Sequence, residues 1–244
     1  MWFNDAFRHG VTATRGVPMV PNHRDDTGAL RHVLWIGGPP DCGKTTIADR
    51  LAERYGLQVY HFDRHEPAHF GRADPARHPA LTAAHPDRMS PEERWLGSPP
   101  EAMARDTLAC WTERFGMAVD DLRAMPVVPP IVAEGPGLFP DCVLPYLADR
   151  RRAIWLVPAE GFKRASVVRR GKPGSRHQTS DPERAQRNLL ARDLIMGAYV
   201  RERAAALDLT LVEVDGSRDL DGMTALVARH FDLWLSSGGT ANDG

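Results

Sequence analysis

The sequence has few cysteines, no long apolar run and no excess of charge of either sign. Its three cysteines, Cys42, Cys110 and Cys142, are odd in number and far apart, which argues against a disulfide framework and favours a reducing cytoplasm. No apolar run approaches the ~20 residues of a membrane-spanning helix, and the N-terminus lacks the basic and apolar regions of a signal peptide. A formal net charge of -1 gives no general case for binding nucleic acid or an acidic membrane. We therefore expect a cytoplasmic protein without a membrane or nucleic-acid partner.

The composition is ordinary for a globular protein, with 42% hydrophobic and 26% charged residues in a chain of 244. This length suits one domain, with or without an inserted subdomain. Residues 1–30 have no clear hydrophobic period, so we expect an N-terminal extension that is partly ordered at best. Residues 236–244 are rich in Gly and Ser and are expected to form a flexible tail. The predicted domain covers residues 31–235.

Apolar strand patterns alternate with helical patterns along this domain. Strands are expected at residues 33–36, 57–62, 127–133, 153–157 and 209–214, and the main helices at 45–55, from 181 onward and at 220–235. Residues 64–126 contain no convincing strand, and Trp111, Phe115, Val119 and Leu122 are spaced as on one side of a helix. This alternation predicts an α/β fold with a parallel sheet covered on both faces. Ligands of such sheets bind at the carboxyl ends of the strands.

The most informative segment follows the first predicted strand directly. It matches the phosphate-binding pattern G-x-x-x-x-G-K-[ST] at every fixed position, with the residues Gly38, Pro39, Pro40, Asp41, Cys42, Gly43, Lys44 and Thr45. Glycines let backbone N–H groups curl around phosphate oxygens, and the following helix adds the positive end of its dipole. Lys44 would reach the β- and γ-phosphates and Thr45 would ligate Mg²⁺, with Thr46 beside them. Cys42 is expected to fill space in the loop, where only the backbone is needed.

Two further features accompany this loop: Asp63 at the end of the second predicted strand, and a basic stretch over residues 163–176. Together they resemble the small-molecule kinases of the P-loop superfamily, such as shikimate, gluconate and adenylylsulfate kinases and chloramphenicol phosphotransferase. The resemblance covers about residues 31–235. It implies a three-layer fold with a five-stranded parallel sheet, a helical acceptor-binding insert at 64–126 and a basic lid at 159–181. It also implies ATP, Mg²⁺ and transfer of the γ-phosphate to a small acceptor.

The resemblance gives a role to Asp63 as well as to the phosphate-binding loop. A carboxylate at this place contacts the acceptor hydroxyl in the resembled kinases, and the reaction needs a group that orients that hydroxyl and accepts its proton. A turn or cap aspartate is the structural alternative. The neighbouring Arg64 and His65 are further candidates for acceptor contact, although a solvated arginine is equally consistent with the sequence.

Glu134 ends the third predicted strand and is followed by Gly135. An acidic residue there holds Mg²⁺ in many phosphate-loop proteins, but it is usually aspartate, so Glu134 is a candidate for either the metal or the acceptor. Gly135 would let a ligand approach the backbone. Asp120 and Asp121 are a second candidate for the acidic residue that holds Mg²⁺. They are expected to lie largely in solvent, because the apolar stripe of their helix faces the core.

A kinase lid needs cations that close over the phosphates, and Arg169 and Arg170 are the candidates in the basic stretch. The stretch also contains Lys163, Arg164, Lys172 and Arg176. The next helix is expected to begin at Asp181, followed by Pro182, a favourable N-cap and first position. On its mainly apolar side, Arg192 requires a carboxylate or a phosphate as partner. The sequence is consistent both with an internal salt bridge of Arg192 and with a contact between Arg192 and ATP.

Two weaker patterns complete the candidate site. His61, His65 and His69 are spaced by four, but His61 belongs to a strand, so a metal site is disfavoured. Asp215, followed by Gly216 and Ser217, matches a loop that approaches adenine in the resembled kinases.

The sequence therefore predicts an ATP-dependent kinase acting on a hydroxyl of a small molecule. A nucleoside or nucleotide kinase is an alternative, for which Trp95 or Trp111 would supply a base slot. An NTP-binding ATPase or regulatory module without an acceptor is another, and a kinase acting on RNA or protein is a third that the near-neutral charge does not favour.

Overall fold

The computed structural model describes residues 28–170 and 174–235, without the side chains of residues 168–170. Most of the predicted extension, part of the predicted lid and the predicted tail lie outside these residues. Leu30, the last residue of the predicted extension, is buried in the core.

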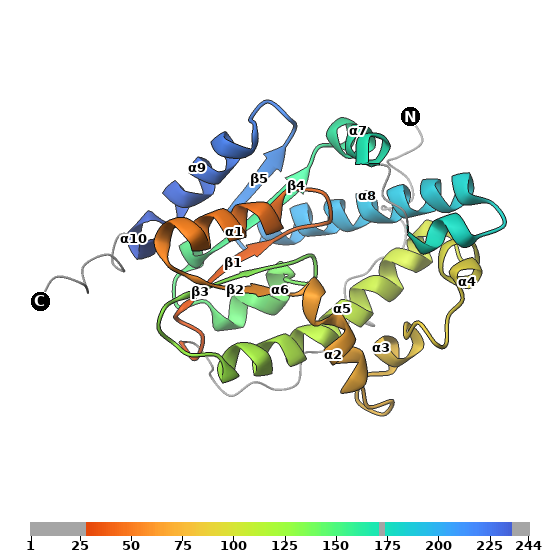
Figure 1. Cartoon of the computed structure of the whole chain (residues 1–244), viewed down its shortest axis with the longest axis horizontal. Coiled ribbons are helices and arrows are strands. Elements are labelled where there is room, and N and C mark those ends of the chain that lie inside the picture. Colours follow the sequence, from red (N-terminus) through yellow and green to blue (C-terminus); the bar gives the residue numbers. More distant parts are fainter. Residues whose placement is uncertain (1–27, 171–173, 236–244) are drawn as a thin grey trace, which may run out of the picture.

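The centre of the molecule is one sheet of five parallel strands, so the predicted α/β class is confirmed (Figure 1). Its strands are β1 (Val33–Gly37), β2 (Gln58–His61), β3 (Ile131–Glu134), β4 (Ala153–Pro158) and β5 (Leu211–Val214). Their order across the sheet is β2-β3-β1-β4-β5. Strand β1 is therefore central, and the phosphate-loop segment leaves the middle of the sheet.

The strand boundaries differ from the predicted ones where proline or local turns intervene. Residues 127–130 are not part of β3, because Pro129 and Pro130 have no N–H to donate to a neighbouring strand. Strand β5 begins two residues later than predicted. Strand β2 ends at His61, and Asp63 opens a 3-10 turn, Asp63–His65, instead of ending the strand.

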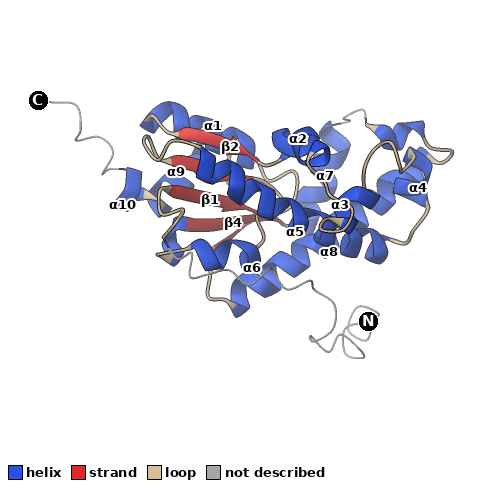
Figure 2. Cartoon of the chain, turned by 90° about the horizontal axis from the view of Figure 1, so that it is seen from below, coloured by secondary structure: helices blue, strands red, loops and turns tan. Residues whose placement is uncertain are grey.

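Helices cover both faces of the sheet and form a lobe beyond its carboxyl edge (Figure 2). They are α1 (Lys44–Tyr55), α2 (Glu66–Gly71), α3 (Pro79–Ala83), α4 (Pro91–Leu96), α5 (Pro100–Ala124), α6 (Pro140–Val143), α7 (Glu160–Arg170), α8 (Pro182–Ala206), α9 (Leu220–His230) and α10 (Asp232–Leu235). Further 3-10 turns cover Leu144–Tyr146, Arg150–Arg152 and Ser175–Gln178. The predicted helical content of residues 64–126 is confirmed, and the predicted last helix is broken at Phe231 into α9 and α10.

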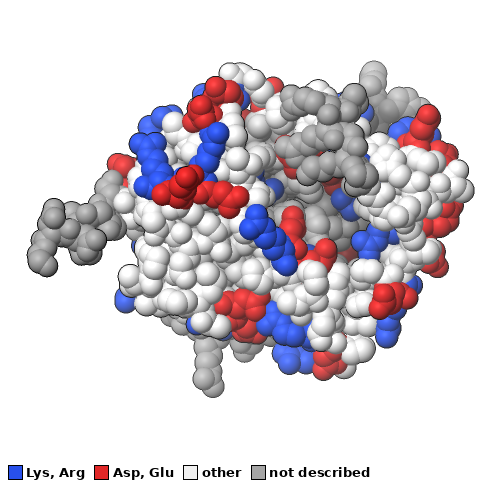
Figure 3. Space-filling model, in the orientation of Figure 1, with Lys and Arg blue, Asp and Glu red and all other residues white. Residues whose placement is uncertain are grey.

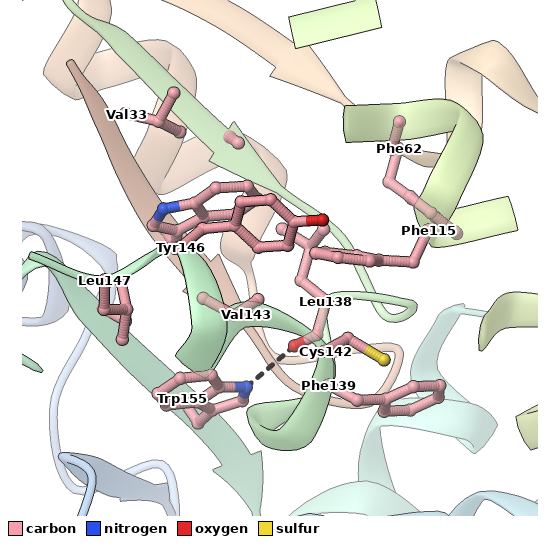
Figure 4. Close-up of a cluster of buried hydrophobic side chains, with 14 of the residues drawn as sticks. Val33, Phe62, Phe115, Leu138, Phe139, Cys142, Val143, Tyr146, Leu147 and Trp155 are labelled. Carbon is pink, nitrogen blue, oxygen red and sulfur yellow. Dashed lines mark hydrogen bonds between the residues drawn. The ribbon is translucent and has the colours of Figure 1, made fainter. Parts of the chain in front are cut away.

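Alternate residues of each central strand enter two separate cores. Trp35 and Trp155 pack with side chains of α5, α6 and α8, whereas Ile36 and Leu156 pack with those of α1 and α9. In the first core the Trp155 Nε1 donates a hydrogen bond to the Leu138 carbonyl at 2.8 Å (Figure 4). Burial on both faces explains why the strands are nearly continuous apolar runs.

The chain leaves β1 and its neighbour β3 towards opposite faces, because α1 belongs to one core and α6 to the other. Such a change of direction between adjacent parallel strands opens a crevice at their carboxyl ends, where ligands of α/β proteins bind. Residues 38–45 and Glu134 flank this crevice. The fold and the sequence motif therefore both indicate the carboxyl edge of the sheet as the place of a ligand site.

None of the described helices is long and apolar enough to cross a membrane. On the face seen in Figure 3, acidic and basic side chains are intermixed and neither sign forms a wide continuous area.

Candidate active site

The loop between β1 and α1 has the backbone geometry that its glycines permit. Gly38 has φ 122 and Gly43 has φ 78, both in the region that side chains rarely occupy. A Cβ at Gly38 would lie 2.0 Å from the Leu156 carbonyl oxygen, so a larger residue is excluded there. Asp41, a non-glycine residue of the loop, also has a positive φ of 73.

Helix α1 begins directly after this loop with an open N-terminus. Its N-cap, Gly43, offers no side-chain acceptor, and no acidic residue occupies the first turn. The first N–H groups of a helix have no partner within it, and they favour an anion. Lys44 is 6% exposed, and its ammonium donates to the Pro39 carbonyl at 2.8 Å. The loop thus places a cation and free N–H groups together.

Cys42, inside the same loop, is buried, and burial raises the pKa of its thiol to about 11. Its Sγ lies 3.0 Å from the Pro39 carbonyl oxygen. A neutral thiol in this position fills space and is a poor nucleophile.

Glu134 lies at the crevice between β1 and β3 and is 3% exposed. The Thr45 hydroxyl donates to its Oε1 at 3.1 Å, and His61 Nδ1 lies 2.8 Å from the same oxygen. The other ring nitrogen of His61 lies 3.1 Å from Asp49 Oδ1. His61 therefore orients Glu134 and holds it beside Thr45, a supporting role that the sequence does not reveal.

The donors at this point fit Mg²⁺. This ion prefers oxygen ligands and is usually held by one or two carboxylates together with substrate phosphates and water. Thr45 and Glu134 supply a hydroxyl and a carboxylate oxygen within 3.1 Å of each other. Among residues 28–170 and 174–235, no group of three or more His, Cys, Asp or Glu side chains could hold a metal ion.

Asp63 lines a cavity of about 740 Å³ that is bordered mainly by residues of the 64–126 segment. Its carboxylate has no hydrogen-bond or ion-pair partner among the described residues. The cavity walls displace water around it, and this burial raises the pKa of Asp63. Lys44 lowers that pKa and Glu134 raises it, so both charges act on the carboxylate. Asp63 thus connects the phosphate loop with the cavity.

Arg64 and His65 do not line this cavity. Arg64 is 65% exposed and lies 4.0 Å from Asp49. His65 stacks on Tyr60 with ring centroids 4.2 Å apart, and its Nδ1 lies 2.9 Å from the His61 carbonyl. Their predicted contact with an acceptor stays a prediction without support from the geometry.

Arg114 on α5 is a buried support of Asp63 that the sequence reading missed. Only 1% exposed, it donates to the Phe62 carbonyl at 2.8 Å and lies against the Phe62 ring. It also pairs with Glu66 at 3.1 Å. Arg114 fixes the backbone immediately before Asp63. Its partners lie far away in the sequence, so no local pattern indicates its burial.

The expectation that Asp121 lies largely outside is wrong. Its side chain is 18% exposed and accepts hydrogen bonds from the Tyr60 hydroxyl and His69 Nε2, each at 2.9 Å, and pairs with Arg72 at 2.8 Å. The apolar stripe of α5 does face the core, but polar groups of β2 and α2 reach around its edge. Asp120 is exposed, as expected.

The three spaced histidines are not gathered into a metal site. His69 donates to Asp121 and accepts from Arg114 Nε at 3.3 Å. Burial lowers the pKa of His69 to about 4, so the ring is neutral at pH 7 and can donate on one side and accept on the other. His61 and His65 have the separate partners described above.

Lys163, at the start of the predicted lid, is the least expected member of the site. It is 1% exposed, and its ammonium pairs with Asp41 of the phosphate loop at 2.7 Å and with Asp193 of α8 at 2.6 Å. Asp193 also accepts from Arg192 at 2.7 Å. Arg192 in turn lines the cavity that contains Asp63. A continuous chain of charges joins the phosphate loop to that cavity.

Arg192 therefore has the internal salt bridge that was one of its two predicted alternatives. Its guanidinium also lies over the Trp95 ring, 5.4 Å from the centroid. Its contact with ATP stays a prediction. The side chains of Arg169 and Arg170 lie outside the described residues, as does Lys172.

We expect Lys163→Met to lower the free energy of unfolding by about 3 kcal/mol, because Asp41 and Asp193 lose the ammonium that is buried between them, while Arg192 still pairs with Asp193. Urea unfolding measures this. Arg164→Met is the matched control: among the described residues this exposed neighbour pairs only with Glu160, so the variant should lose less than about 1 kcal/mol. Equal losses in the two variants would contradict the structural role of Lys163.

A second cavity, of about 370 Å³, adjoins the other side of the phosphate loop. Residues of the loop, of α7 and of the turn after β5 line it, and Gly216 with φ 88 approaches the Phe162 ring. The predicted adenine loop thus reaches the phosphate-loop segment. Asp215 itself is exposed and accepts hydrogen bonds from Ser217, whereas Gly216 and Arg218 line the cavity.

No protein-family model and no curated protein matches this sequence. Among solved structures, shikimate kinase from Acinetobacter baumannii in complex with shikimate is 16% identical, with a TM-score of 0.40 over 84% of this chain and 93% of that one. An uncharacterized protein from Eubacterium ventriosum is 12% identical, with a TM-score of 0.36 over 83% of this chain and 99% of that one. The five-stranded parallel sheet and the glycine-containing loop after its central strand define an α/β protein.

Proposed function

We propose that this protein is a kinase that transfers the γ-phosphate of ATP, with Mg²⁺, to a hydroxyl of a small molecule. The observation that carries the proposal is the position of Asp63. Its carboxylate has no partner among the described residues, lines a cavity of about 740 Å³ and is subject to the charge of Lys44 in the phosphate loop.

Each part of the reaction has a candidate group. The N–H groups of the loop and Lys44 would hold the phosphates, and Thr45 with Glu134 would hold Mg²⁺, which supplies charge neutralisation when bound. Asp63 would accept the proton of the acceptor hydroxyl as that oxygen bonds to the γ-phosphorus and the bond to the ADP oxygen breaks. Arg169 and Arg170 would close over the transferring group. The second cavity would receive the base.

A nucleoside kinase is the second candidate, because Trp111 lines the acceptor cavity and presents a ring on which a base could stack. Trp95 is less suitable, since Arg192 already covers its ring. An acceptor-independent ATPase would leave the cavity beside Asp63 without a role. The cytoplasmic location expected from the cysteine content stays a prediction.

ATP consumption with Mg²⁺ and a panel of small hydroxyl compounds tests the proposal, with mass spectrometry to detect the gain of one phosphate. We expect turnover that depends on an acceptor. Steady hydrolysis that no acceptor changes, across a panel that includes nucleosides, would favour the ATPase alternative.

A further inference from the structure

The polar lining of the cavity beside Asp63 is mainly acidic. Four carboxylates and two arginines line it, an excess of two negative charges among the described residues. The carboxylates are those of Asp63, Glu66, Glu93 and Asp106, and the arginines are Arg94 and Arg192. A pocket that selects an anion is expected to show the opposite balance.

Both arginines of the lining are already engaged. Arg94 Nη2 donates to the Ala84 carbonyl at 2.7 Å. Arg192 donates through Nε and Nη2 to Asp193 at 3.0 and 2.7 Å. Asp193 thus occupies the Nε and Nη2 edge of Arg192 and offsets its charge, whereas the other N–H groups of both guanidinium groups have no partner among the described residues.

Two of the four lining carboxylates have firm partners within the protein, and two do not. Glu66 pairs with Arg114, and Glu93 accepts from the backbone and hydroxyl of Ser90. Asp63 has no partner among the described residues, and Asp106 is exposed with only its neighbour Arg105 at 3.4 Å. Among the described residues of the lining, the balance of charge is therefore negative, although both arginines keep N–H groups that a ligand could use.

The rest of the wall is largely apolar. Phe70, Met89, Met103 and Trp111 contribute side chains, and alanines make up much of the remainder. A cavity of about 740 Å³ is within the range that encloses a drug-sized ligand. Such a wall binds a bulky apolar skeleton better than a small, fully hydroxylated one.

We propose that the acceptor is a bulky, largely apolar alcohol that carries no anionic group, with a basic amine or only neutral groups as its further polar substituents. This inference rests on the proposed function for the assignment of the cavity to the acceptor. It excludes hydroxy acids, sugar phosphates and nucleoside monophosphates as acceptors. It leaves neutral and basic alcohols that have a large apolar skeleton.

Ligand binding without ATP tests this inference separately from catalysis. The probes are aromatic and alicyclic alcohols in sets of three that share one skeleton: an amine, its N-acetyl derivative and its N-succinyl derivative. An example is 2-amino-1-phenylpropane-1,3-diol with its two acylated forms. Ligand-observed NMR ranks the sets, and calorimetry measures dissociation constants for those that bind.

We expect the amine and neutral forms to bind at least ~10-fold more tightly than the succinyl form, a difference of about 1.4 kcal/mol. Asp106→Lys should reduce this preference by roughly 3- to 10-fold, because it reverses one charge of the lining. Asp120→Lys is the matched control on the same helix. Asp120 is exposed and does not line the cavity, so the preference should not change.

Preferential binding of the succinyl forms, a preference that Asp106→Lys leaves unaltered, or no binding in any set would overturn the inference. Phosphorylation of an anionic acceptor would also overturn it while supporting the proposed kinase activity. Selective binding of the amines without any phosphate transfer would support the charge preference and contradict the proposed function.

Discussion

Replacing Lys44 with alanine is expected to lower phosphoryl transfer by at least ~10³-fold, because the variant loses the cation that stabilises charge on the transferring phosphate. Two observations support this expectation. Its ammonium lies inside the loop, within reach of the Pro39 carbonyl, at the open N-terminus of α1. Arrival of a phosphate would give that ammonium a charged partner in place of a neutral carbonyl.

The fold should survive this substitution. Pro39, which loses the Lys44 ammonium, still has the Cys42 thiol 3.0 Å from its carbonyl oxygen. Alanine is also a strong helix former at the first position of α1. Turnover, ATP affinity and urea unfolding should be measured together, so that a loss of activity can be separated from a loss of structure.

Arg54→Ala is the control for Lys44→Ala. Arg54 is an exposed cation in the last turn of the same helix and lies over the Tyr55 ring, far along α1 from the loop. Its loss should leave turnover within about twofold, as for a surface change away from the site. If Lys44→Ala were as active as Arg54→Ala, phosphate binding by this loop would be refuted.

The features predicted correctly from the sequence depend on short stretches of chain. Asp181, which was predicted as an N-cap, does cap α8 by accepting from the Arg184 N–H. The apolar runs at 33–36 and 153–157 likewise form strands that are buried on both faces of the sheet, as predicted. Local sequence contains these signals because backbone geometry and burial act on neighbouring residues.

The residues that were missed have partners far away in the sequence. Arg114 binds Phe62 and Glu66, and Lys163 joins Asp41 to Asp193. Nothing close to either residue in the chain indicates its burial. A basic stretch such as 163–176 usually lies in solvent, and only the packing of α7 against the loop and α8 shows that its first lysine is structural.

The same limitation explains the error at Asp121. Apolar spacing indicates which side of a helix faces the core. A polar side chain at the edge of that side can still form hydrogen bonds with buried groups. Tyr60 and His69 carry the donors that do so here. Two buried polar groups that need an acceptor determine the position of this carboxylate more strongly than its helical phase.

Asp63→Asn is expected to reduce turnover by ~10²-fold or more, as is typical of the loss of a general base, with little change in ATP affinity. Asparagine has nearly the same shape but cannot accept the proton. Asp74→Asn is the matched control in the same segment, since Asp74 is exposed and its carboxylate only accepts the Ala76 N–H. The control should retain normal turnover.

The pH profile gives the second expected result for Asp63. A base must be ionised, so activity should fall as the pH falls through the pKa of Asp63. Because burial raises that pKa, the acidic limb should lie above the ordinary aspartate value of about 3.9. This limb should be absent from the residual activity of Asp63→Asn.

Stability distinguishes a base from a structural cap. A carboxylate whose pKa is raised by folding favours the folded state while it is protonated, and this contribution is lost as the pH rises through its folded pKa. At pH 7 the ionised Asp63 therefore opposes folding, and Asp63→Asn should unfold at the same or a higher urea concentration than the wild type. A cap would show the reverse, with a loss of ~1 kcal/mol and nearly normal turnover. Lower activity with undiminished stability is the combination expected of a carboxylate that is held free of partners in order to take a proton.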